Sequence, residues 1–568
     1  MFRNFLKKIR RRQLFGGHNT EIDPDVIFMD STNLPEFDTD QFEGRIVHPI
    51  DHRSVLGLGV FFALLVIIFV GKLWYIEIYN GSVYAETSEN NREKRVTIFA
   101  DRGIVYDRKH VPLVWNDIVP NAEYSIRTYA STTGLSLLLG YLDYPKKDKY
   151  GYYYKKTFDG KSGIEESFND LLSGTNGEDI TEIDALGNVV SKSVVDEPVH
   201  GQNITLSIDS KLQHRMFEVI EKSAYEYGFQ SGAGILMDVE SGEIITMASY
   251  PEYSSTVMTN GTSEGKSYEL NRRDNPFLNR VISGLYTPGS IVKPFIAIAA
   301  LTEDIIAPEK QILSTGALKI PNPYFPGQFS VFGDWKAHGW VDMRHALAVS
   351  SDVYFYEIGG GFEDQPGLGI VRIDKYMKLF GFGGLTGIGL SSEKEGTIPT
   401  PEWKKKMFNG EEWRIGNTYH TAIGQYGFQV TPLQAVRAAA ALANGGKLVT
   451  PHLMLNDKTA ATQNIPLSLD ARDFQIVREG MRLSVTEGIA QNENVPYVKV
   501  AAKTGTAEVG ISKSLVNSWV IGFFPYDHPR YAFAVVMERG PRANLVGSPY
   551  VFRQVLDWKS INTPEYFR

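Results

Sequence analysis

The chain has 568 residues, of which 43% are hydrophobic and 22% charged, which is enough apolar material for roughly two to four packed domains. Lys and Arg number 58 against 66 Asp and Glu, and this net charge of −8 argues against a nucleic-acid partner. The absence of cysteine excludes disulfides, Cys-ligated metal centres and a Cys nucleophile. A mean hydropathy of −0.20 argues against a polytopic membrane protein.

An uncharged apolar stretch near the N-terminus predicts one transmembrane helix over residues 54–76. A helix from Val55 to Ile76 is roughly 33 Å long, which matches a bilayer core. The first twelve residues contain six Arg or Lys and no acid, so the positive-inside rule places residues 1–53 in the cytoplasm as a tail. The rest of the chain then lies outside, as in a single-pass protein of the cytoplasmic (inner) membrane. A cleaved signal peptide is the alternative, but the basic region and the apolar stretch are both too long for one.

Beyond the membrane we expect two domains, a mainly β membrane-proximal pedestal over 77–225 and a larger domain over 226–568. The pedestal shows short strand-like runs and one helix pattern over 163–172. The larger domain has helical patterns from about 290 to 490, between strand patterns at 232–238, 243–250, 497–508, 518–524 and 530–537. This order predicts an α+β fold, in which the first and last strands pair in a central antiparallel sheet and helices cover both sides.

Three Ser-x-x-Lys motifs, which begin at Ser263, Ser290 and Ser391, could each give a serine nucleophile a nearby base. Only Ser290 precedes an apolar helix pattern (IVKPFIAIAAL); the other two lie in polar stretches, where the lysine would be solvated. We expect Ser290 at a helix N-terminus and Lys293 buried beneath it, where desolvation favours the neutral amine that a base needs. The alternative is an ordinary helix cap followed by a surface lysine.

Two further elements favour Ser290. The run Lys503, Thr504, Gly505, Thr506 lies in a strand pattern, where the glycine admits a ligand backbone and the other side chains offer a cation and hydroxyls to a carboxylate. The Ser350-x-Asp352 triplet lies between Ser290 and Lys503 on an apolar helical stretch. A second serine there could relay protons between Lys293, Lys503 and a leaving group.

The ordered set Ser-x-x-Lys, Ser-x-Asn/Asp, Lys-Thr-Gly resembles the signature of penicillin-binding proteins and serine β-lactamases. Longer segments resemble the class B penicillin-binding proteins over about 100 to 540. These segments are DRGIVYDR, GKSGIEESFNDLLSGTNG, GQNITLSIDSKLQ, NPFLNRVISGLYTPGSIVKPF, HGWVDMRHALAVSSDVYFYEIG, GEEWRIGNTYHTAIGQYGFQVTPLQ and KTGTAE.

The resemblance implies a cofactor-free D,D-transpeptidase that cross-links peptidoglycan stem peptides and is inhibited by β-lactams. It implies that Ser290 is the nucleophile and Lys293 its base, that Ser350 and Lys503 shuttle protons, and that Asp352 belongs to the polar network. Thr504, Gly505 and Thr506 would bind substrate, and the N–H groups of Ser290 and Thr506 would form the oxyanion hole.

Within class B the chain is more similar to the elongation-type members, which implies a role in cell-wall elongation and cell shape. The features are Ser-x-Asp before Val-Tyr-Phe-Tyr, the distance from Gly424-Gln425 to Thr431-Pro432, and Trp403-Lys404 ahead of Trp413. No glycosyltransferase domain fits before residue 230, so the resemblance implies a SEDS glycosyltransferase of the RodA kind as partner. The alternatives are a septal transpeptidase, a β-lactam sensor, a non-catalytic scaffold and a β-lactamase.

Three departures from the family stand out. Asp352 is a carboxylate where many relatives have an amide, and Asn517-Ser518-Trp519 stands where His-Ala-Trp is common. Asp107-Arg108-Lys109-His110 replaces the usual Asp-Arg-Asn-Gly. Asp334 and His338 raise the question of a metal, since some elongation-type relatives carry zinc near this region; with no cysteine to complete a set, we expect no metal site.

Overall fold

The computed structural model describes residues 52–81, 93–183, 189–322, 325–457, 459, 463–510 and 513–567. Residues 1–51 of the predicted cytoplasmic tail lie outside the described residues. The chain forms two units, Met1–Arg92 and Glu93–Arg568, which we describe separately. Because the second unit contains both predicted extracytoplasmic domains, the boundary at 225/226 stays a prediction.

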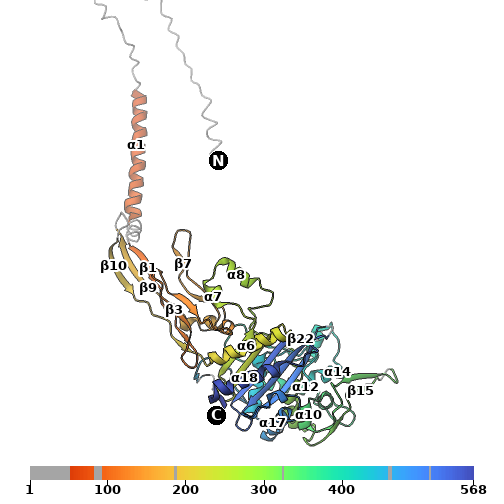
Figure 1. Cartoon of the computed structure of the whole chain (residues 1–568). Helices are drawn as coiled ribbons and strands as arrows, with labels where there is room; N and C mark the ends of the chain where they lie inside the picture. The colour runs from red at the N-terminus through yellow and green to blue at the C-terminus, as the bar shows by residue number, and fades with distance from the viewer. Residues whose placement is uncertain are drawn as a thin grey trace, which may run out of the picture. The chain divides into compact units, whose positions relative to one another are not determined.

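In the first unit, α1 (His52–Trp74) continues into one turn of π-helix, η4 (Tyr75–Tyr79). Among the described residues, Val55–Tyr79 is the one helical segment long and apolar enough to cross a membrane (Figure 1). Nearly all of its apolar side chains are exposed, for example Ile67 at 65%, as expected for a surface that contacts lipid. The predicted span of 54–76 therefore falls on a continuous helix.

The N-terminal part of the second unit, which falls within the predicted pedestal, is mainly β, as predicted. One antiparallel sheet has the order β1-β9-β10, and a second has the order β11-β2-β3-β4, with β11 parallel to β2. The strands of these sheets are β1 (Glu93–Ile98), β2 (Val105–Tyr106), β3 (Pro112–Asp117), β4 (Ile126–Tyr129), β9 (Gly177–Ile183), β10 (Val189–Asp196) and β11 (Ile204–Thr205). Smaller elements are β5 (Leu142–Asp143), β6 (Lys146–Lys147), β7 (Tyr153–Lys155), β8 (Asp159–Gly160), α3 (Ser136–Leu139), α4 (Gly163–Ser167) and α5 (Asn169–Ser173). The single helix predicted over 163–172 is thus two short helices, because Phe168 leaves the helical conformation (φ −109°, ψ 23°).

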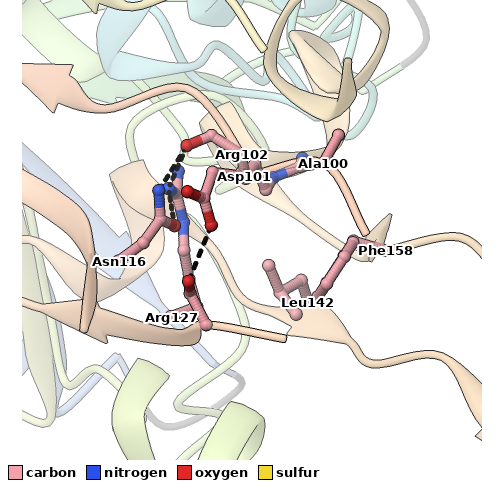
Figure 2. A pocket seen from close by; sticks show the side chains of 8 residues that line it. Ala100, Asp101, Arg102, Asn116, Arg127, Leu142 and Phe158 are labelled. Atoms are coloured by element: carbon pink, nitrogen blue, oxygen red, sulfur yellow. Dashed lines mark hydrogen bonds between the residues drawn. The ribbon is translucent and has the colours of Figure 1, made fainter. Parts of the chain in front are cut away.

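A buried ionic network holds the pedestal together. The fully buried carboxylate of Glu165 accepts hydrogen bonds from Arg102 and from Arg127, 2.7 Å away. Asn116 links the two arginines, because its amide donates to the Arg102 carbonyl and its oxygen accepts from Arg127 (Figure 2). The adjoining cavity of about 10 Å³ has room for one water and none for a substrate. The DRG and GIEES segments therefore lie in contact, and their charged side chains form part of the buried core of the pedestal.

The centre of the larger part is a five-stranded antiparallel sheet in the order β13-β12-β22-β21-β20. Its strands are β12 (Ser231–Asp238), β13 (Ile244–Tyr250), β20 (Ala501–Val509), β21 (Leu515–Phe524) and β22 (Tyr531–Pro541). The N-terminal strand β12 pairs with the C-terminal strand β22 along its whole length, from Ser231 opposite Glu538 to Asp238 opposite Tyr531. The predicted pairing of the first and last strands is confirmed.

Helices cover both faces of this sheet (Figure 1). Along each strand, successive side chains enter different cores: Val520 packs with helices α6 (Ser210–Tyr227) and α18 (Ser548–Asn562), whereas Ile521 packs with α9 (Lys293–Thr302) and α15 (Pro432–Ala443). The strands are therefore apolar on both faces, with few polar positions. The predicted α+β fold with helices on both sides is confirmed.

The remaining elements lie mostly between β13 and β20. The helices are α7 (Ser255–Asn260), α8 (Ser263–Leu270), η5 (Gly289–Val292), α10 (Met343–Val349), α11 (Asp352–Gly360), α12 (Gly369–Leu379), α13 (Pro401–Met407), α14 (Ile415–Ala422), α17 (Ala471–Thr486), η6 (Gln491–Glu493) and the C-terminal η7 (Pro564–Phe567). The short strands are β14 (Ile312–Ser314), β15 (Ala317–Pro321), β16 (Phe329–Gly333), β17 (Gly339–Val341), β18 (Lys447–Leu448) and β19 (Ile465–Pro466).

Candidate functional site

Ser290 lies in a tight turn at the start of the buried helix α9. The structure corrects one detail of the prediction: Ser290 is inside the 3-10 turn η5, and α9 begins only at Lys293. Pro294 occupies the first turn of α9, where its missing N–H costs nothing. Gly289 (φ +57°) enters the turn in the left-handed region and donates its N–H to the carbonyl of Gly424 at 3.0 Å. The Gly-Gln segment at 424 thus supports the turn that carries Ser290.

Lys293 is fully buried, as predicted, and its amine is surrounded by acceptors. Its Nζ lies 2.8 Å from the carbonyl oxygen of Ser350, 3.2 Å from the Ser350 hydroxyl and 2.6 Å from Oδ1 of Asp352. An ammonium has three N–H donors, so these acceptors satisfy all of them. The Ser-x-Asp triplet therefore closes over Lys293.

Lys503 reaches the same hydroxyl from the sheet. It is fully buried on the edge strand β20, and its Nζ donates to Ser350 Oγ at 2.8 Å and to the Thr504 carbonyl at 2.9 Å. Burial and, next in effect, the positive charge of Lys293 lower the pKa of Lys503 well below its usual value, and the charge of Asp352 opposes them. Burial and the neighbouring charge therefore favour the neutral form of Lys503, one of the two amines in contact with Ser350.

The strand β20 lies directly against the turn that carries Ser290. A Cβ on Gly505 would come within 2.9 Å of the Pro288 carbonyl oxygen, and one on Gly289 within 2.8 Å of the Thr506 carbonyl oxygen. Thr504 is half-buried and Thr506 is exposed, so both hydroxyls can meet a ligand. Gly505 is required here because two backbones approach closely, not because of an unusual dihedral angle.

Two residues around the site, Trp519 and His420, were not identified from the sequence. Trp519 on β21 donates its indole N–H to the Thr287 carbonyl at 3.1 Å and so fixes the approach to Ser290. His420 lies beside Phe332, with ring centres 5.5 Å apart, and desolvation lowers its pKa. The one sequence signal near Trp519 was the Asn517-Ser518-Trp519 run, which differs from the usual His-Ala-Trp. No sequence signal pointed to His420.

Ser350 itself is held in a strained conformation. Its φ of 58° and ψ of 44° lie in the left-handed region, which costs a non-glycine residue roughly 1–2 kcal/mol. This turn separates α10 from α11 and brings residues 350 and 352 onto Lys293. Surrounding contacts must stabilise the conformation.

The other two Ser-x-x-Lys motifs lie elsewhere, and the pair Asp334/His338 contacts neither Lys293 nor Lys503 through a hydrogen bond. Lys266 donates to the Thr259 carbonyl, and Ser391 donates to Glu166 across to the pedestal. His338 Nε2 lies 3.4 Å from Asp334 Oδ1, and both side chains are buried. Across the described ranges, no group of three or more His, Cys, Asp or Glu residues that could hold a metal ion was found.

Together, a helix-flanked antiparallel sheet and a serine-lysine cluster at its edge strand define a penicillin-recognising serine acyltransferase architecture. The family model described as "Penicillin binding protein transpeptidase domain" matches residues 232–557, and the "Penicillin-binding Protein dimerisation domain" matches residues 119–206. The chain belongs to the penicillin-binding protein transpeptidase family and has the class B arrangement, a dimerisation domain followed by a transpeptidase domain.

Three relatives show the extent of the similarity. The peptidoglycan D,D-transpeptidase MrdA of Haemophilus influenzae is 30% identical over 505 residues, which are 83% of this chain and 73% of that protein. PBP2 of Helicobacter pylori, solved in complex with MreC, is 25% identical with a TM-score of 0.69 over 82% of this chain and 99% of that one. PBP2 of Pseudomonas aeruginosa, solved in complex with WCK 5153, is 28% identical with a TM-score of 0.66, over 82% of this chain and 97% of that one.

Proposed function

We propose that this chain is a peptidoglycan D,D-transpeptidase that cross-links stem peptides through an acyl-enzyme on Ser290 during cell-wall elongation. The observation that carries the proposal is the Ser350 hydroxyl, which two buried lysines contact at 3.2 and 2.8 Å beside the Ser290 turn. A structural role alone does not account for two buried lysines on one hydroxyl, because burying a lysine amine costs several kcal/mol when it is charged and not fully compensated. The similarity to peptidoglycan D,D-transpeptidases named MrdA supports the same assignment.

In the proposed reaction, Ser290 Oγ attacks the carbonyl carbon of the D-Ala–D-Ala bond of a donor stem peptide. Lys293 is the base that takes up the Ser290 proton, and Ser350 and Lys503 relay a proton to the departing nitrogen of D-Ala. The C–N bond breaks, D-Ala leaves, and an ester joins the stem peptide to Ser290. The amine of an acceptor stem peptide then attacks this ester, and Ser290 regains its proton.

The strand β20 supplies the substrate contacts in this proposal. The terminal carboxylate of the donor would bind Lys503 and the hydroxyls of Thr504 and Thr506, while Gly505 leaves room for the peptide backbone. The backbone N–H groups of Ser290 and Thr506 would stabilise the oxyanion. Asp352 would keep the side chains of Lys293 and Ser350 in position relative to each other.

The membrane context is also part of the proposal. The apolar helix α1 and the basic start of the chain favour a single-pass protein of the cytoplasmic membrane, with residues 1–53 inside and the pedestal (77–225) and catalytic domain (226–568) outside. We further propose that a SEDS glycosyltransferase of the RodA kind makes the glycan that this chain cross-links. The Helicobacter pylori relative was solved in complex with MreC, which supports the assembly of this chain with a partner protein.

Covalent labelling by a fluorescent penicillin tests the chemistry, because β-lactams mimic D-Ala–D-Ala and trap the acyl-enzyme. The full-length protein in detergent should label, whereas Ser290→Ala and Lys293→Ala should remain folded and unlabelled. The chain provides matched controls in another copy of the motif: Ser263→Ala and Lys266→Ala should label at the wild-type rate. Labelling of Ser290→Ala, or no labelling of folded wild type with a RodA-type partner present, would refute the proposal.

The septal transpeptidase is the remaining alternative within the family. It would use the same residues on the same substrate, so labelling does not distinguish the two roles. Depletion of the protein in its native bacterium does: loss of rod shape supports elongation, and filaments would assign the protein to division.

A further inference from the structure

The buried carboxylate of Asp334 lies behind the catalytic Ser350-x-Asp352 loop, outside the set of residues that contact the lysines. Asp334 belongs to the link between β16 and β17, and its side chain is fully buried. Its Oδ2 accepts hydrogen bonds from the Ser314 hydroxyl at 3.2 Å, the Ser351 hydroxyl at 3.0 Å and the Val353 N–H at 3.1 Å. Two of these three donors come from the loop itself.

The loop residues alternate in direction. Ser350 and Asp352 face Lys293 and Lys503, whereas Ser351 and the Val353 N–H face Asp334. Ser351 also caps α11, because its hydroxyl accepts the Tyr354 N–H at 3.3 Å. The position of the Ser350 hydroxyl is therefore determined from behind as well as from the lysines in front.

The link that carries Asp334 is itself rigidly attached. The Asp334 N–H donates to the Gly316 carbonyl at 2.8 Å, and the His338 N–H donates to the Ser314 carbonyl at 2.9 Å. The Trp335 indole donates to the carbonyl of Val349, the residue before Ser350, at 3.3 Å. A second contact from the same link thus reaches the other side of the strained turn.

We propose that Asp334 is a positioning residue for acyl transfer: its carboxylate holds Ser351 and Val353, and thereby fixes Ser350 and Asp352 against the two lysines. The inference rests on the proposed transpeptidase function. Asp334 touches neither substrate nor nucleophile, so its loss should slow the chemical step and leave β-lactam recognition on β20 intact. A misplacement of about 1 Å in such a site lowers the rate by about a hundredfold.

The test measures acylation of the full-length protein by a chromogenic cephalosporin over a range of concentrations, which separates the acylation rate k2 from the binding constant Ks. Asp334→Asn should lower k2 about 10- to 100-fold and change Ks less than threefold. Asp342→Asn is the matched control: Asp342 caps α10 eight residues away, through the His345 N–H at 2.9 Å, and asparagine caps equally well. This control should keep both constants.

Ser351→Ala removes the loop side of the contact and keeps the test decisive if Asp334→Asn folds poorly. It should also lower k2, and the double variant should lose less than the product of the two single losses, because both remove the same hydrogen bond. Wild-type k2 in both single variants, or losses that multiply, would overturn the proposal. If the loss of k2 is fully explained by the fraction of the variant that is unfolded, Asp334 stabilises the fold and the positioning role is refuted.

A further experiment tests whether Asp334 and His338, which are both buried, instead bind a metal ion. Treatment of the full-length wild-type protein with EDTA should leave k2 unchanged. If EDTA lowers k2 to the level of Asp334→Asn, Asp334 acts as a metal ligand and the positioning role is refuted. If the wild-type protein does not acylate under any condition, the proposed function itself fails, which is a different outcome from equal k2 values in wild type and variants.

Discussion

Asp352 contributes a negative charge beside the amines around Ser350, and replacing it with asparagine tests the effect of this charge. Its Oδ1 lies 2.6 Å from Lys293 Nζ, and its side chain is 20% exposed while that of Lys293 is fully buried. Asparagine keeps the size of the side chain and one oxygen acceptor but removes the negative charge. The charge of Asp352 also opposes the lowering of the pKa of Lys503, so its removal favours the neutral form of Lys503.

The size of the effect follows from the contact. An opposite charge within hydrogen-bond reach shifts a titration by about 1–3 pH units, and partial exposure of Asp352 selects the lower part of this range. We therefore expect the acid limb of the k2/Ks profile of Asp352→Asn to move down by about 1–2 pH units. At one unit, the change is worth about 1.4 kcal/mol.

The assay is penicillin acylation between pH 4.5 and 9, with Asp342→Asn as the control that keeps the wild-type profile. Loss of the charge lowers the pKa of Lys503 further, which sets the expected direction of the change. An acid limb that stays in place or moves to higher pH would refute the reasoning.

Three other predictions concern separate parts of the molecule. Gly505→Ala should lower acylation at least about tenfold, because its Cβ would lie 2.9 Å from the Pro288 carbonyl oxygen, whereas Gly333→Ala, with nothing within 4 Å, should behave as wild type in the same assay. Lys503→Ala should raise KM for a stem-peptide substrate at least as much as it lowers kcat, since Lys503 is expected to bind the substrate carboxylate; a pure kcat effect would assign it to proton transfer. Lys559→Met should raise the free energy of unfolding at pH 7 by about 1–3 kcal/mol, because Lys559 Nζ is buried without a hydrogen-bond partner and 4.2 Å from the Tyr566 ring centre. Burial lowers the pKa of Lys559, so the unfolded chain binds more protons and the stability of the wild type should rise with pH toward 10.5. Urea unfolding at several pH values should show this rise, and the rise should be smaller in Lys559→Met. Destabilisation by methionine would instead mean that the aromatic rings stabilise the ammonium form.

The central sheet could be predicted because its strands carry a strong local signal. Apolar runs such as 232–238 are bounded by turn residues, and β12 and β22 fall within a few residues of the predicted ranges. The predicted strand at 497–508 begins four residues before β20, since Val498 and Val500 are buried and alternate like strand residues. Their segment is instead held from outside the ladder: the Lys499 carbonyl accepts the Tyr526 N–H, and the Val500 carbonyl accepts Arg482. The sequence does not show which partner a backbone carbonyl will find.

The candidate site also has a part that the sequence predicts and a part that it does not. Ser290, Lys293, Ser350, Asp352 and Lys503 could be picked out because each motif carries its own spacing, and the structure brings four of them into hydrogen-bond contact, with Ser290 on the adjoining turn. Their catalytic roles stay predictions. The contacts that hold them are long-range: Asp334 joins the loop at 351 to Ser314, and Trp519 reaches Thr287 across 232 positions. No local pattern marks an acceptor whose donors lie on other elements.

The charges at Ser350 connect substrate recognition with proton transfer. With Lys293 paired to Asp352, burial and the charge of Lys293 favour a neutral Lys503 in the free site. The carboxylate of a donor peptide bound at β20 would reverse this balance, because a nearby negative charge favours the ammonium form. Lys503 would then take up a proton as the substrate binds and could pass one through Ser350 to the departing amine. In the proposed mechanism, a ligand without that carboxylate lacks both the anchoring contact and the proton donor, so the terminal carboxylate contributes to the rate of acyl transfer as well as to binding.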